Sequence, residues 1–169
     1  YHDVDVRAAA EALAKALPRG IKVIAADFVD THHAALMAQA AGAVYRVTLP
    51  YTKDIQEAVA QFNAAESLLF KKVAPKLKAG YKEIDVKQFI AELAVAQEGE
   101  NTVLSFDCKI TPTGSMKAVD LLNALNEHYA LDLPVELADI ERLRLYRLNK
   151  RGGKIGMLNT DAVKLMENK

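Results

Sequence analysis

The order in which two hydrophobic periodicities follow one another from Ala43 onward most limits the fold of this chain. Alternating residues at 43–49 predict a strand, and helical spacing at 52–64 predicts a helix capped by Thr52. Further alternating runs predict strands at 67–73, 89–97, 101–110 and 139–148. One more helical pattern predicts a helix at 115–128. The short link around Gly99 is typical of a hairpin.

This order predicts an α+β fold, a ferredoxin-like split βαβ sandwich with one mainly antiparallel sheet and helices on one face. All five strands are expected to share that sheet, and helices 52–64 and 115–128 are expected to pack on the same side of it. The alternation and the apolar stripes predict a buried core that includes Val47, Ile55, Val59, Phe62, Phe89, Leu104, Phe106, Leu122 and Leu145.

The rest of the chain predicts two flanking regions. Residues 1–42, with a helix at 6–17, a strand at 21–29 and a short helix at 32–42 capped by Asp30 or Thr31, would be the remainder of a second, similar N-terminal unit. The ferredoxin-like domain would span 43–148. A basic, glycine-containing tail would follow at 149–169, with a short helix at 161–168 capped by Asn159 or Thr160. Because Tyr1, Val4 and Val6 resemble the end of a strand, we expect this chain to be a piece of a longer protein.

Charge is balanced overall but unevenly distributed. Lysine plus arginine and aspartate plus glutamate number 22 each, so any attraction to a polyanion must be local. One run is opposed only by Glu83 and Asp85, and it contains Lys71, Lys72, Lys76, Lys78, Lys82 and Lys87. A second run holds no acid, and it contains Arg142, Arg144, Arg147, Lys150, Arg151 and Lys154. Two cationic surfaces for a polyanion and two merely solvated faces are both compatible with this pattern.

The phrase YKEIDVKQFI at 81–90 ties the first basic run to the fold. Ile84, Val86, Phe89 and Ile90 are spaced to anchor the segment to a core while the lysines stay in water. We therefore expect a packed crossing element with a cationic surface rather than a disordered linker.

The residues that ligate metals do not occur at metal-binding spacing. His32 and His33 are adjacent and would point about 100° apart on a helix, while His2 and His128 are isolated. Cys108 alternates with apolar neighbours in a predicted strand, which favours a buried, inert thiol. We expect neither a metal site nor a cofactor in this chain.

The sequence also contains no recognisable motif for nucleophilic or acid–base catalysis. Ser67, Ser105 and Ser115 lack an elbow sequence, and spacing alone does not pair Asp85 with Asp107. The segment TPTGSMK at 111–117 is more informative, since a glycine precedes a helix start with Lys117 in its first turn. Free N–H groups there favour an anion, although ordinary capping explains the same residues and the P-loop spacing is absent.

Cysteine usage and hydropathy bear on location. One cysteine excludes an internal disulfide and suits a reducing compartment, so we expect a cytoplasmic protein. No apolar run approaches the roughly 20 residues needed to span a bilayer, and the first residues lack a signal-peptide pattern.

Several phrases together resemble one bacterial family. LPRGIKV, AAGAVYRVTLP, AAESLLFKK, YKEIDVKQFI, TGSMKAVDLLNAL and IERLRLYRL occur in the order and spacing of the radical-SAM-linked proteins, which are found beside or fused to radical SAM enzymes. The resemblance extends to about residue 148. The Phe-Asn-Pro-His-Pro type motif of the family's N-terminal part is absent here, and so is a CxxxCxxC iron–sulfur motif, which assigns any radical chemistry to a partner.

The resemblance implies an accessory role, with RNA modification as the expected setting. We therefore expect a non-catalytic domain that binds RNA or another phosphate-bearing substrate for a radical SAM partner. Its candidate contacts are Lys71, Lys72, Lys76, Lys78, Lys82, Lys87, Lys117, Arg142, Arg144 and Arg147. The alternatives are an enzyme or small-molecule-binding domain whose site lies mostly in the missing N-terminal part, and a protein-interaction module.

Overall fold

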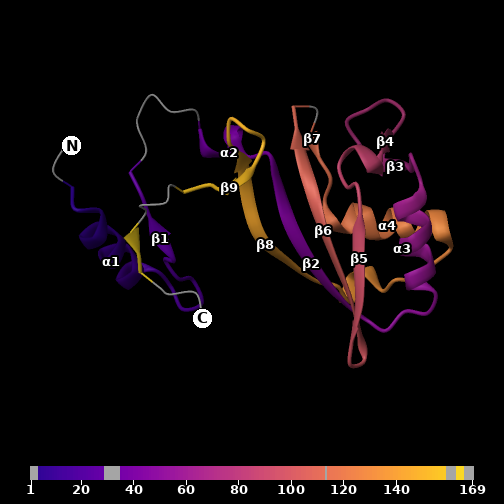
Figure 1. Ribbon diagram of the computed structural model, residues 1–169, viewed down its shortest axis with the longest axis horizontal. Helices are drawn as coiled ribbons and strands as arrows, with labels where there is room; N and C mark the ends of the chain where they lie inside the picture. Colours follow the sequence, from indigo (N-terminus) through magenta and orange to yellow (C-terminus); the bar gives the residue numbers. More distant parts are fainter. Residues whose placement is uncertain (1–3, 29–34, 113, 159–162, 166–169) are drawn as a thin grey trace. The chain divides into compact units, whose positions relative to one another are not determined.

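The computed structural model describes residues 4–28, 35–112, 114–158 and 163–165, and it divides the chain into two compact units. The first unit comprises Tyr1–Gln39 and Ile155–Lys169, and the second comprises Ala40–Lys154. The described elements of the first unit are α1 (Val6–Ala16), β1 (Ala25–Ala26), α2 (Leu36–Gln39) and β10 (Val163–Lys164). β1 and β10 pair antiparallel, so an N-terminal and a C-terminal segment of the chain lie side by side in this unit (Figure 1).

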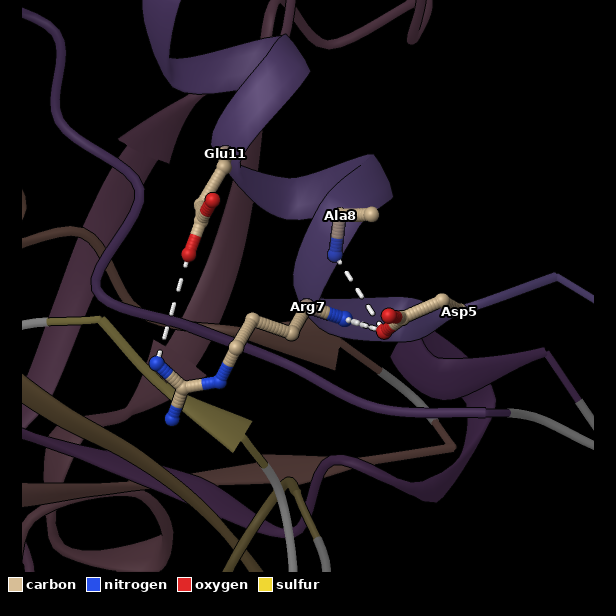
Figure 2. Close-up of polar contacts among 4 residues, drawn as sticks. All are labelled: Asp5, Arg7, Ala8 and Glu11. Carbon is tan, nitrogen blue, oxygen red and sulfur yellow. Dashed lines mark hydrogen bonds and ion pairs between the residues drawn. The ribbon is translucent and has the colours of Figure 1, made fainter.

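Helix α1 begins where a side chain satisfies its first free N–H groups. The Asp5 carboxylate accepts hydrogen bonds from the backbone N–H groups of Arg7 at 2.9 Å and Ala8 at 3.3 Å (Figure 2). Arg7 and Glu11, one turn apart, form an exposed ion pair at 4.0 Å. The predicted helix at 6–17 is therefore confirmed to within one residue.

Other predictions for the first unit need correction. The strand expected at 21–29 is confined to β1, and α2 covers only part of the helix expected at 32–42. The helix expected at 161–168 is wrong where it can be checked, because Val163–Lys164 forms β10 and pairs with β1. The expected caps Asp30, Thr31, Asn159 and Thr160 lie outside the described residues.

The second unit is built on an antiparallel sheet with helices, as predicted. The strand order is β5 (Leu93–Glu98), β6 (Asn101–Thr111), β2 (Gly42–Pro50), β8 (Asp139–Leu148) and β9 (Lys154–Gly156), and short β7 (Gly114–Ser115) pairs with the end of β6. The expected hairpin is present as β5–β6, with Gly99 in its turn at φ 59°. This mixed α+β architecture is compatible with the split βαβ arrangement.

One predicted strand does not join the main sheet. β3 (Leu69–Val73) pairs with β4 (Tyr81–Asp85) in a separate two-stranded sheet. Two hydrogen bonds join the open end of this hairpin. The Asp85 carboxylate accepts the N–H of Leu68 at 3.0 Å, and the Val86 N–H donates to the Leu68 carbonyl at 2.8 Å. The 3-10 helix η1 (Val86–Gln88) follows. Its turn continues through the N–H groups of Phe89 and Ile90, so the strand expected to begin at 89 begins at Leu93.

Helices α3 (Ile55–Ala64) and α4 (Ala118–Tyr129) lie on the same side of the sheet, as expected (Figure 1). Their buried residues join one core with same-face residues of the strands, such as Val47 and Leu104, which pair directly. After α4 the chain passes through the 3-10 helix η2 (Val135–Leu137) into β8.

The predicted cap of α3 is wrong. Thr52 is buried two residues earlier, where its hydroxyl donates to the Pro50 carbonyl at 3.2 Å and its N–H donates to Thr102 Oγ1 at 3.3 Å. The cap position is held by Asp54 at φ 64°, and its side chain makes no capping hydrogen bond. Thr52 is thus occupied in joining the end of β2 to β6.

The predicted core is confirmed with one exception. All of the residues expected to be buried are buried apart from Leu145, which is only half-buried. β8 lies beyond β2 in the strand order, away from the β5–β6 hairpin, so fewer side chains cover Leu145. None of the helices in the described part of the chain combines the length and apolar character needed to cross a bilayer.

Candidate anion-binding surface

The first basic run forms most of a hairpin with two different faces. We call residues 69–85, which comprise β3, β4 and their turn, the lysine hairpin. Lys72 lies directly opposite Lys82, and the neighbouring pair Phe70 and Ile84 packs against the core. Side chains two residues apart on a strand share a face, as do residues directly opposite in an antiparallel pair. Lys72 and Lys82 therefore lie on the inner face of the hairpin.

The turn of the lysine hairpin is closed by backbone hydrogen bonds. Ala74 N–H donates to the Gly80 carbonyl at 2.9 Å, Leu77 N–H to the Ala74 carbonyl at 2.9 Å, and Gly80 N–H to the Leu77 carbonyl at 2.8 Å. Gly80 adopts φ 74°, which favours glycine. This ordered turn presents Lys76 and Lys78 to solvent.

A hollow of about 220 Å³ brings the lysine hairpin together with the segment before α4. Hairpin residues form one wall and β7 forms another, and the lining consists of Lys72, Val73, Ala74, Lys82, Ile84, Phe89, Gly114 and Ser115. Two signals about thirty residues apart in the sequence, the lysine run and the TPTGSMK segment, thus meet at one place. We call this the lysine pocket.

The start of α4 adds two charged groups near the lysine pocket. Lys117 occupies the N-cap position, is exposed and makes no side-chain capping bond. Asp120 lies in the first turn, and its Oδ2 is 2.8 Å from Lys72 Nζ. The side chains of Lys72 and Asp120 are only 29% and 19% exposed. This ion pair joins the hairpin to the helix.

The remaining lysines of the run differ in their freedom. Lys71 is exposed, and its ammonium lies 5.2 Å from the centre of the Tyr81 ring. Lys87 is tied down, because Nζ donates to the carbonyls of Phe62 at 2.9 Å and Ala91 at 2.5 Å. It also lies 4.3 Å from the Phe62 ring centre. Lys87 thus connects η1 to α3 rather than facing solvent.

The arginines of β8 are split by a β-bulge. Val44 lies opposite Arg144 whereas the next residue, Tyr45, lies opposite Arg142, so Leu143 is the extra residue. Arg142 therefore shares the face of Tyr45, whose ring stacks on Phe106 of the core, while Arg144 shares the opposite face. Simple alternation places both on one face, and the bulge separates them.

The two basic runs do not form one continuous surface. The lysine hairpin lies beside α3 and α4, and β8 lies on the other side of β2 from these helices (Figure 1). Arg147 is half-buried near the end of β8. Of the ten candidate contacts, the structure brings the hairpin lysines and the start of α4 together and leaves Arg142, Arg144 and Arg147 apart.

Comparison with known proteins identifies a family. The family model described as "Uncharacterized protein conserved in bacteria (DUF2344)" matches residues 1–124. The chain belongs to this family. No curated protein and no solved structure matches it. The match includes the lysine hairpin, β7 and the first turns of α4.

Sequence reasoning missed a polar cluster on the other face of the sheet of this DUF2344 chain. The buried Tyr146 hydroxyl donates to Asp107 Oδ1 at 2.5 Å, and Lys154 pairs with the other carboxylate oxygen of Asp107. The cations of Arg144 and Lys154 lie 5.9 Å and 5.1 Å from the Tyr146 ring centre. Burial, and then the Asp107 carboxylate, raise the pKa of Tyr146, so the phenol stays protonated and donates.

Gly42 is the residue that admits this arrangement. A Cβ at position 42 would lie 2.2 Å from the Tyr146 hydroxyl oxygen and 2.5 Å from Cζ. A glycine at the start of an alternating strand is the one signal in the sequence that points to such a close approach. The cluster engages Asp107 and Arg144, both of which had been considered as functional groups.

Cys108 is buried, as predicted. Its thiol lies 3.4 Å from the Met116 carbonyl, and burial raises its pKa above the ordinary value. In the described part of the chain, no group of three or more histidine, cysteine, aspartate or glutamate residues is placed to hold a metal ion.

A larger hollow of about 540 Å³ lies between the loop after β2 and the loop after α4. Its lining includes the carboxylates of Asp54, Asp132 and Glu136. Asp54 and Ala130, both on its wall, adopt the left-handed φ values of 64° and 50°. The Tyr129 hydroxyl is buried and has no hydrogen-bond partner among the residues that the structure describes, and burial raises its pKa.

Proposed function

We propose that this chain is an accessory, non-catalytic domain that binds RNA or another phosphate-bearing substrate through the lysine pocket. The observation that carries the proposal is the convergence of Lys72 and Lys82 with β7 at one hollow. Further exposed cations lie on the same hairpin and at the start of α4, namely Lys71, Lys76, Lys78 and Lys117. The surface thus combines a recess with several solvent-exposed ammonium groups.

The chemistry of the surface suits phosphate. Lysine ammonium groups on flexible stems act as point charges that contact phosphate oxygens, and each contact releases counterions from a nucleic acid. The first N–H groups of a helix also favour negative charge, and α4 begins three residues after Ser115. Because the whole chain has zero formal net charge, any attraction to an anion must come from a local concentration of charge such as this surface.

Lys87 and the three arginines of β8 are not central to the proposed binding surface. Lys87 is held by two backbone carbonyls, and Arg144 lies over Tyr146 on the opposite face of the sheet. Arg142 and Arg147 also lie on β8, away from the lysine hairpin. We therefore centre the proposal on Lys71, Lys72, Lys76, Lys78, Lys82 and Lys117.

The partner in this proposal is a radical SAM enzyme. Its support is the resemblance of the phrases from LPRGIKV to IERLRLYRL to radical-SAM-linked proteins. The sequence has a single cysteine, Cys108, which is too few to hold an iron–sulfur cluster within one chain. The partner would supply the radical chemistry, and this chain would present the substrate.

The decisive experiment is a fluorescence titration of a labelled structured RNA at several salt concentrations. Lys82→Gln removes one charge from the lysine pocket, and Lys53→Gln removes one exposed charge from the loop before α3 as a matched control. We expect Lys82→Gln to weaken binding and to lower the slope of log K against log salt by about one, while Lys53→Gln changes neither. Absence of binding by the parent at low salt, or equal slopes for both variants, would contradict the proposal.

The large hollow favours a second candidate, a small-molecule-binding or enzymatic domain. An unpartnered buried hydroxyl and two left-handed residues on one wall are features that recur at ligand sites. The two functions are separable in the same assay. A small molecule that raises the melting temperature of the parent but not of an Asp132→Asn variant would favour the second candidate.

A further inference from the structure

The outer face of the lysine hairpin carries a row of apolar side chains that is open to water. Val73 and Tyr81 lie directly opposite each other, so their side chains share this face. Val73 is 77% exposed and Tyr81 is 43% exposed. Leu69, on the same face of β3, and Leu77, in the turn, are also exposed. Apolar groups gathered in this way on a small hairpin are typical of a binding surface.

Three lysines lie beside this row. Lys71 lies on the same face, with its ammonium 5.2 Å from the centre of the Tyr81 ring. Lys76 and Lys78 flank Leu77 at the tip. The strand register also places two acids on this face, Glu83 opposite Lys71 and Asp85 opposite Leu69, and the Asp85 carboxylate accepts the backbone N–H groups of Leu68 and Lys87. A complementary partner must therefore combine negative charge with flat or apolar surface.

We infer that the outer face of the lysine hairpin binds single-stranded RNA, with an unpaired base stacked on Tyr81 and its phosphates at the lysines around it. The inference rests on the proposed function and specifies its substrate. A nucleotide carries an anion and a flat ring in one unit, which matches an ammonium placed beside an exposed aromatic ring. A duplex exposes its phosphates but covers the faces of its bases. It would therefore contact the lysines without stacking a base on Tyr81.

The hairpin is pre-organised for this contact. Phe70 and Ile84 hold its inner face on the core, and the three backbone bonds from Ala74 to Gly80 close its turn. The outer face is consequently presented on a fixed ribbon, and little ordering of the protein accompanies binding. The lysine pocket on the inner side remains available for a further phosphate of the same strand.

The test compares a labelled 12-nucleotide oligouridine with a 12-base-pair RNA duplex by fluorescence anisotropy. Tyr81→Leu keeps an apolar side chain and removes the ring, whereas Tyr81→Phe keeps the ring. We expect the parent to bind the single strand more tightly than the duplex, and Tyr81→Leu to weaken single-strand binding by about 5- to 100-fold. Tyr81→Phe should stay within about twofold of the parent, and none of the variants should change duplex binding.

A second readout locates the base directly. Photocrosslinking of an oligomer that contains 5-iodouridine, followed by mass spectrometry, should place the crosslink on the peptide that contains Tyr81. Equal binding of both RNA forms with no effect of Tyr81→Leu would overturn the stacking inference and leave the proposed function standing. If the parent binds neither RNA at low salt, the proposed function fails, and the inference fails with it.

Other occupants of the face give different results. If the chain self-associates in sedimentation velocity and Val73→Glu abolishes the association, the face belongs to a second copy and the inference is overturned. The inference is also overturned if oligoglutamate, an acidic peptide, competes with the single strand, and if the Tyr81→Leu variant binds the peptide and the single strand as tightly as the parent does. Retention of the parent's preference for single strands in the presence of oligoglutamate supports the inference.

Discussion

Lys72 Nζ lies 2.8 Å from Asp120 Oδ2, so an ion pair links the inner face of the lysine hairpin to the first turn of α4. Both side chains are less than one-third exposed. The Asp120 carboxylate therefore neutralises the Lys72 ammonium in the lining of the lysine pocket, where the proposed function needs a free cation.

Asp120→Asn should strengthen RNA binding. The amide keeps the shape of the side chain but releases the Lys72 ammonium and removes a negative charge beside the pocket. A pair of this kind contributes on the order of 1 kcal/mol, so we expect about a fivefold gain in affinity and a small loss of thermal stability. The measurement is the RNA titration, with Asp139→Asn as a control that removes an exposed charge on β8. An ion pair with a purely structural role would lower stability and leave affinity unchanged.

Lys87 and Lys78 should separate a structural lysine from a binding lysine. Lys87→Met removes the donor to the carbonyls of Phe62 and Ala91, so we expect a loss of about 1–3 kcal/mol in the free energy of unfolding. Lys78→Met, in the exposed turn, should leave stability within about 0.5 kcal/mol and lower the salt slope of RNA binding by about one. Urea unfolding and the titration check both, and an interchange of the two effects would refute the assignment.

Phe106→Ala should destabilise the second unit strongly. Phe106 is 4% exposed, and its ring centre lies 5.4 Å from that of Tyr45. Truncation leaves a cavity under α3 and α4, at a cost of about 3–5 kcal/mol in the free energy of unfolding. Leu137→Ala, at a position that is 63% exposed, is the control and should change it by less than about 0.5 kcal/mol. Chemical denaturation followed by circular dichroism gives both values.

Gly42→Ala should displace Tyr146. The new methyl group would lie 2.2 Å from the tyrosine hydroxyl oxygen, so the ring must move and its hydrogen bond to Asp107 must break. We expect a loss of about 1–3 kcal/mol. In a Tyr146→Ala background the same substitution should cost less, because the clash with the ring is gone and only the close approach to the Cys108 carbonyl oxygen, at 2.9 Å, remains. A double-mutant cycle measures this coupling. Additive costs would mean that the two residues do not interact.

Stability should fall in alkaline solution because of Cys108. Burial raises the pKa of this thiol above its ordinary value of 9.0. Above pH 9 the unfolded chain releases this proton while the folded chain retains it, so the stabilisation present at lower pH is progressively lost until the folded pKa is reached. Urea midpoints measured from pH 7 to pH 10 should decline less steeply for Cys108→Ala. Tyr146, whose pKa is also raised, adds to the decline at higher pH in both proteins.

Local patterns in the sequence were sufficient for most elements of the second unit. Alternation over β2 and β6 placed Val47, Leu104 and Phe106 on one buried face, because side chains of a strand point to opposite sides in turn. The helical stripe of α3 placed Ile55 and Phe62 in the same core. These features depend on neighbours in the chain, so they can be predicted without knowledge of the tertiary structure.

Charge spacing located the lysine run but not its geometry. Lys72 and Lys82 are ten residues apart, and only the register of β3 against β4 sets them side by side. The approach of Ser115 to the same pocket depends on where α4 packs. Likewise, the apolar residues of β8, Ile140, Leu143, Leu145 and Leu148, fit two competing faces in the sequence. Only the strand register shows that the bulge at Leu143 puts Arg142 and Arg144 on opposite faces.

The sequence by itself determined the α+β class, most helical and extended segments of the second unit, the burial of Cys108 and the concentration of lysines at 71–87. Only the tertiary structure decided that β3 pairs with β4 instead of joining the main sheet, and that Lys87 donates to backbone carbonyls while Lys82 lines a pocket. The physical reason is range. Periodicity and charge density are properties of adjacent residues, whereas strand partners, registers and ion pairs depend on which distant segments the packed core brings together.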